Sequence, residues 1–155
     1  MASLRQVGKR RSGESGAELI EFALVLPFLL VIVLGIIDFG LLFQRYYVVT
    51  NAAREGARVS VLPGYSDEDV ETRVNQYLTA GGLTDPDADT TVGAPVPIPI
   101  GGGQCITVRP VTVVYPYQYS AVGQLAGLFD GDGFSRSSVQ ATSAMRSELA
   151  AGGCS

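Results

Sequence analysis

A run of 22 residues from Phe22 to Phe43 contains one charged residue, Asp38. As an α-helix this run is about 33 Å long, enough to cross the hydrocarbon core of a bilayer, which is about 30 Å thick. Its apolar residues cover every face of the helix, whereas a core helix of a soluble protein normally keeps a polar face. The run therefore predicts a single transmembrane helix.

The flanks of this helix predict its orientation. Basic residues are packed tightly in the short segment before it, and a long polar segment follows it. Because a basic N-terminal segment stays in the cytoplasm and a long C-terminal domain is translocated whatever its charge, we expect a cytoplasmic N-terminus and an extracytoplasmic domain. The basic residues are Arg5, Lys9, Arg10 and Arg11 before the helix, and Arg45, Arg54 and Arg58 after it.

Gly16 lies five residues before Glu21, between the basic leader and the apolar run. A secretory signal peptide would have a shorter apolar stretch with a small-residue cleavage site behind it, and residues 38–45 offer no such site. The arrangement instead resembles the type IV prepilin signal, which an aspartyl prepilin peptidase cuts after the glycine. The resemblance implies cleavage between Gly16 and Ala17, with the apolar helix retained.

Glu21 is an acid at the edge of the hydrocarbon, where an unpaired carboxylate is costly. After cleavage, the new amine of Ala17, in the same or a neighbouring subunit, can pair with it. The alternative is that Glu21 lies in the headgroup layer as an acid at a helix start, where the helix dipole favours it.

Three segments carry a family resemblance: GAELIEFALVLP at 16–27, GIIDFG at 35–40 and NAAREGAR at 51–58. They resemble the TadE-like family, minor pseudopilins of the tight-adherence, or Flp, pilus system. The resemblance covers about residues 16–61, with a weaker one at 144–148. It implies an inner-membrane protein without enzymatic activity, whose partners are a prepilin peptidase, other pilin-like subunits and pilus assembly proteins.

The composition argues against an enzyme. The chain has no histidine, which excludes histidine-based triads, relays and metal ligands, and it lacks a Gly-x-Ser-x-Gly motif and a glycine-rich phosphate loop. We expect no cofactor, no metal and no nucleic acid as partner. Two functions remain: a subunit needed for pilus assembly and cleaved after Gly16, or an uncleaved single-pass anchor that displays a ligand-binding or wall-binding module.

The fold class predicted for the whole chain is α+β. Residues 1–16 are the leader, 17–62 are the pilin-like transmembrane helix with its extracytoplasmic extension, and 63–155 are a small extracytoplasmic domain. The long helix should end at about Val61, before Pro63-Gly64, and the small residues Ala52, Ala53, Gly56 and Ala57 should let the sheet approach it closely. A second helix should start at Ser66, end at Gly81-Gly82 and bury Val70, Val74 and Leu78.

The rest of the domain predicts a short antiparallel sheet of two to four strands, packed on the outer half of the long helix. Residues 104–115 and 134–146 have strand patterns, with a bulge or edge position needed at Pro110. Residues 84–103, with four prolines and a glycine triplet, predict an irregular connection. Aromatic and leucine side chains between 115 and 129 pack in the core, or else form a half-buried connection or an interfacial patch. Asp130–Gly133 is a turn rather than a calcium loop.

Two cysteines and one acid complete the candidate residues. Cys105 and Cys154 both fall outside the membrane, where an oxidising compartment would let them pair, the alternative being two free thiols. Asp38 should lie near the outer membrane interface and be partly hydrated, or else pair with a basic residue of a neighbouring subunit.

Overall fold

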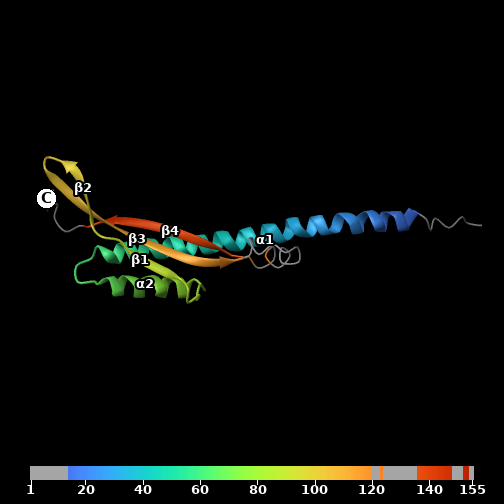
Figure 1. Ribbon diagram of the computed structural model, residues 1–155, viewed down its shortest axis with the longest axis horizontal. Coiled ribbons are helices and arrows are strands. Elements are labelled where there is room, and N and C mark those ends of the chain that lie inside the picture. Colours follow the sequence, from blue (N-terminus) through green and yellow to red (C-terminus); the bar gives the residue numbers. More distant parts are fainter. Residues whose placement is uncertain (1–13, 120–122, 124–135, 148–151, 154–155) are drawn as a thin grey trace, which may run out of the picture.

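The computed structural model describes residues 14–119, 123, 136–147 and 152–153. Helix α1 (Glu14–Ser60) has 47 residues, so it is about 70 Å long, and it runs through Pro27 without interruption. Its N-terminal half projects beyond all other labelled elements, and its C-terminal half is covered by the domain (Figure 1). The predicted long helix extending into a small α+β domain is confirmed, and its end at Ser60 agrees with the predicted stop.

Helix α2 (Asp67–Ala80) forms where its capping residues predict it. The Ser66 hydroxyl accepts a hydrogen bond from the Asp69 N–H, and the Asp69 carboxylate accepts one from the Ser66 N–H at 2.8 Å. This capping box satisfies two backbone donors that the helix start would otherwise leave unpaired. The acids of the first turn therefore act as a helix start, and the predicted apolar stripe of Val70, Val74 and Leu78 is buried.

In the described ranges, the sheet has five antiparallel strands and is built around one long strand, β3 (Gln104–Gln118). β1 (Asp89–Val92) and β2 (Val96–Gly101) pair with one edge of β3. β4 (Arg136–Arg146) and β5 (Gly152–Gly153) pair with the other edge. The prediction of two to four strands is therefore too low, because two separate strands pair with each edge of β3.

The prediction that residues 84–103 form an irregular connection is wrong, because β1 and β2 lie there. Pro97 and Pro99 are tolerated because β2 is an edge strand, where a proline nitrogen that faces away from the paired strand removes no ladder hydrogen bond. In β3, Pro110 lies opposite the break between β1 and β2, where the Gly93 N–H donates to the Pro110 carbonyl at 2.8 Å. The bulge or edge position predicted at Pro110 is thus the gap between β1 and β2 along one edge of β3. The strand continues to Gln118 rather than ending at residue 115.

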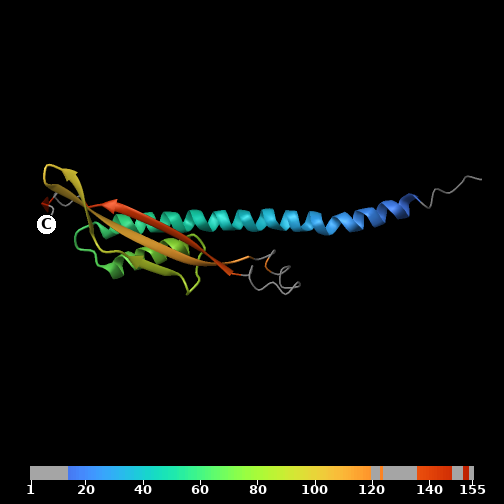
Figure 2. The same ribbon diagram turned by 45° about the horizontal axis from the view of Figure 1, so that its top comes forward.

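The core lies between the sheet and the two helices, which cover the same sheet face (Figure 2). Alternate residues of β3 point into it, as do Val139 and Ala141 of the predicted returning strand. At Gly56, α1 approaches both α2 and the sheet closely: a Cβ built there would lie 2.6 Å from Val74 Cγ2 and 3.2 Å from Val111 Cγ1. The small residues of α1 therefore admit the sheet, as predicted, and α2 as well.

The aromatic residues at the end of β3 belong to the core, which confirms the prediction of core packing for them. Tyr115 and Tyr117 are buried, and Tyr119 packs against them. Leu125, Leu128, Phe129 and the turn at Asp130–Gly133 lie outside the described residues.

Candidate processing and assembly site

The predicted processing site lies close to the N-terminal end of α1. Gly16, Ala17 and Glu21 are all exposed, and a Cβ built on Gly16 would meet no atom within 4 Å. Because α1 begins at Glu14, the bond from Gly16 to Ala17 is helical. A peptidase that binds an extended backbone therefore requires the first turn to unwind.

That unwinding costs little. The first four N–H groups of a helix have no intrahelical partner, and glycine is less favourable in a helix than alanine by about 1 kcal/mol. Glu21 follows Ala17 by one helical turn, and side chains on a helix lean toward its N-terminus. The carboxylate of Glu21 therefore leans toward the position where cleavage would create an amine.

Farther along α1, Asp38 is the first buried residue of the described helix, with 2 % of its surface exposed. The expectation that it is partly hydrated is wrong, because its own domain covers it. The Tyr117 hydroxyl donates a hydrogen bond to the Asp38 backbone carbonyl at 3.0 Å, and the Arg45 guanidinium lies 4.8 Å from the centre of the Tyr117 ring. Burial, and then the nearby Asp38 carboxylate, raise the pKa of Tyr117, which keeps its hydroxyl protonated as a donor.

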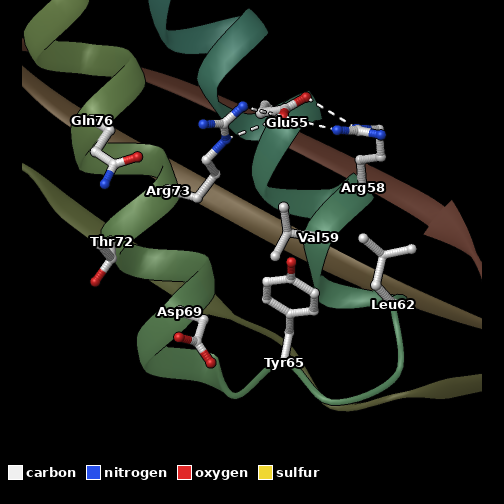
Figure 3. Close-up of a pocket in the computed structure, with 9 residues that line it drawn as sticks. All are labelled: Glu55, Arg58, Val59, Leu62, Tyr65, Asp69, Thr72, Arg73 and Gln76. Carbon is white, nitrogen blue, oxygen red and sulfur yellow. Dashed lines mark hydrogen bonds and ion pairs between the residues drawn. The ribbon is translucent and has the colours of Figure 1, made fainter.

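A second charged cluster joins α1 to α2 (Figure 3). Arg58 and Arg73 approach the Glu55 carboxylate from two sides, at 3.2 Å and 2.9 Å. Hydrogen bonds from Arg58 and then Arg73 lower the pKa of Glu55. These residues line one end of a groove of about 310 Å³ that continues past Tyr65 and Asp69. The spacing of Glu55 and Arg58 could have predicted their pair, but no local signal identifies Arg73, which is 18 residues away.

Replacing Glu55 with glutamine should remove both ion pairs and lower the free energy of unfolding by about 1 kcal/mol at pH 7, because the Glu55 side chain is only 20 % exposed. Since the folded pKa is lowered, this stabilisation is complete well above the ordinary value of 4.5 and is lost as the pH falls through the folded pKa. Urea titrations of the protein in micelles at pH 7 and pH 3 measure the difference. Glu71→Gln on the exposed face of α2 is the control, and equal stability of both variants at pH 7 would contradict the prediction.

The C-terminal end of the chain returns to one of the two cysteines. Cys105 is buried and faces Gly152 of β5 in the sheet register. Cys154 follows β5 directly in the sequence but lies outside the described residues. The disulfide between Cys105 and Cys154 stays a prediction, which this return of the chain supports.

Within the part of the chain that the structure describes, no group of three or more His, Cys, Asp or Glu residues could hold a metal ion. Among the described residues, one helix is long and apolar enough to cross a membrane, over Gly16–Ser60. The fold and this bare helix define a single-pass membrane protein with a small α+β domain.

The family model described as TadE-like protein matches residues 16–58. This match confirms the resemblance to the TadE-like family, a family of Tad pilus components. No curated protein and no solved structure matches the chain. The matched segment contains Gly16, Glu21, Asp38, Glu55 and Arg58, whereas α2 and the sheet lie beyond it.

Proposed function

We propose that this protein is a minor pseudopilin-like subunit needed for assembly of a Tad, or Flp, type IVb pilus, after a prepilin peptidase removes residues 1–16. One observation carries the proposal: the TadE-like match begins at Gly16, and no residue of α1 from there to Ile37 is buried by the protein's own domain. A bare apolar helix of this length is available both to the bilayer and to the helices of other pilin-like subunits. The leader would be cytoplasmic and the domain extracytoplasmic.

Glu21 has a specific role in this proposal. An exposed carboxylate on the bare part of the helix needs a partner once the helix enters the membrane. Cleavage after Gly16 would supply that partner as the amine of Ala17, in the same or a neighbouring subunit. The cut would thus both remove the basic leader and lower the cost of placing Glu21 among other helices.

The test is co-expression of the full chain with a prepilin peptidase, followed by measurement of its intact mass. We expect a loss of residues 1–16 from the native chain and no loss from Gly16→Val. Because a Cβ at Gly16 meets open space, the substitution should leave membrane insertion and the domain unchanged. If the peptidase does not cleave Gly16→Val, the cause would therefore be the altered cleavage site and not a misfolded protein.

Gly35→Val is the matched control, since Gly35 is another α1 glycine whose Cβ would meet no atom within 4 Å. Its processing should be normal. Normal processing of Gly16→Val would show that the site lies elsewhere, and an unshortened native chain would sink the pseudopilin proposal.

The second candidate function is an uncleaved anchor that displays a ligand-binding or wall-binding module. The observation that favours it is the end of the TadE-like match at residue 58, which leaves α2 and the sheet outside the family segment as a module of their own. An intact mass that retains residues 1–16 in the presence of the peptidase would select this function.

A further inference from the structure

The contact between Tyr117 and Asp38 limits how far the domain can stand from a membrane. The helix below Asp38, from Ala17 to Ile37, has 21 residues and a length of about 31 Å. A hydrocarbon core is about 30 Å thick, so crossing it requires nearly the whole of this segment. The outer boundary of the hydrocarbon therefore falls close to Asp38, where the domain already begins.

A shift of the helix along its own axis moves this outer boundary by only a few residues. If Glu21 were kept in the cytoplasmic headgroup layer, the uncharged stretch from Phe22 to Ile37 would be about 24 Å long, short of the core by about 6 Å. The missing length corresponds to four residues, which moves the boundary from Asp38 to Leu42. In either position, the end of the domain meets the headgroup layer.

The side chains of α1 at this level suit such a layer. Four aromatic residues within nine positions are left uncovered by the domain, the two phenylalanines nearer the apolar helix and the two tyrosines farther out. Aromatic rings are enriched where a protein crosses a membrane interface, and tyrosine fits there because its ring is apolar while its hydroxyl binds water. We call these residues the aromatic band: Phe39 (60 % exposed), Phe43 (60 %), Tyr46 (48 %) and Tyr47 (68 %).

We propose that the aromatic band and the Tyr117 end of β3 form a seat on the phospholipid headgroup layer of the leaflet on the domain's side, so that the domain rests directly on the membrane. The occupant is lipid because the phenylalanines of the band continue the apolar helix directly, and the polar Gln44 and Arg45 and the two tyrosines follow where a headgroup layer replaces the hydrocarbon. Above the band, the next exposed α1 side chains are the charged Arg54 and Arg58. The inference rests on the transmembrane helix and goes beyond the proposed function in pilus assembly.

The chain contains no tryptophan, so a single introduced tryptophan reports its own depth. The full chain would be placed in vesicles of phosphatidylethanolamine and phosphatidylglycerol, with bromine either near the acyl carbonyls or near the chain ends. Phe43→Trp is the reporter in the band. Phe28→Trp, about 16 Å along the helix from Ala17, reports the bilayer centre, and Tyr77→Trp on α2 is the control in water.

We expect shallow bromine to quench Phe43→Trp more strongly than deep bromine, and at least about three times as strongly as it quenches Tyr77→Trp, because only the band lies in the interface. Phe28→Trp should be quenched most by deep bromine. If Phe28→Trp is quenched but Phe43→Trp behaves like Tyr77→Trp and is quenched by aqueous acrylamide, the helix spans the bilayer and the seat is wrong. If Phe43→Trp is shielded from acrylamide and from both bromine positions, another protein helix covers the band, which also overturns the seat.

Discussion

Replacing Gly56 with leucine should destabilise the domain by about 3 kcal/mol or more, because an added side chain at this position has no space to occupy. Even a Cβ at Gly56 would lie 2.6 Å from Val74 Cγ2, closer than any relaxed contact, and 3.2 Å from Val111 Cγ1. Both valines are fully buried and branched, so neither can swing away from the new atoms. The substitution should therefore separate α1 from α2 and from the sheet together.

Urea titration of the full chain in micelles, followed by near-ultraviolet circular dichroism of the tyrosines, measures this loss. Gly40→Leu is the matched control, since a Cβ on Gly40 meets no atom within 4 Å and the change should cost little. Gly56→Ala should fall between the two. A Gly56→Leu variant as stable as Gly40→Leu would mean that α1 and α2 do not pack in solution as they do in the structure.

The two helices could be predicted because their signals are local. Ser66 and Asp69 are three residues apart and cap α2 with each other, and its apolar stripe repeats once per turn. The edge strands could not be predicted, because proline and glycine normally mark loops. Only the antiparallel pairing of β2 with β3 across a short glycine turn makes positions such as Pro97 and Pro99 compatible with a strand.

The residues of the candidate site likewise divide into those with a local sequence signal and those whose contacts lie far apart in the sequence. Gly16 and Glu21 form a motif that can be read from one short segment, and α1 keeps both exposed on its bare end. The contacts of Asp38 with Tyr117 and of Glu55 with Arg73 could not be predicted, since Tyr117 is 79 residues from Asp38 and Arg73 is 18 residues from Glu55. Asp38 was expected to be partly hydrated, because the sequence alone does not show that the domain extends along α1 as far as Asp38.

Replacing Tyr117 with alanine should lower the free energy of unfolding by about 3–5 kcal/mol, because it removes a large buried ring from the end of the domain nearest the apolar helix. Tyr117 is 1 % exposed, and its ring meets that of Tyr119 edge to face at a centroid distance of 4.9 Å. We expect the lower ends of β3 and β4 to separate from α1. Hydrogen exchange of the full chain in micelles should then be faster in β3 and β4 than in α2.

Tyr117→Phe is the matched control, since it keeps the ring and loses only the hydrogen bond to the Asp38 carbonyl. Its cost should be about 1 kcal/mol or less, because that carbonyl can still accept the ordinary i to i+4 helical bond. Equal losses in the two variants would assign the attachment to the hydrogen bond rather than to ring packing. Unchanged exchange in Tyr117→Ala would show that the domain is not held to α1 at Asp38, and the short distance between domain and membrane would lose its physical basis.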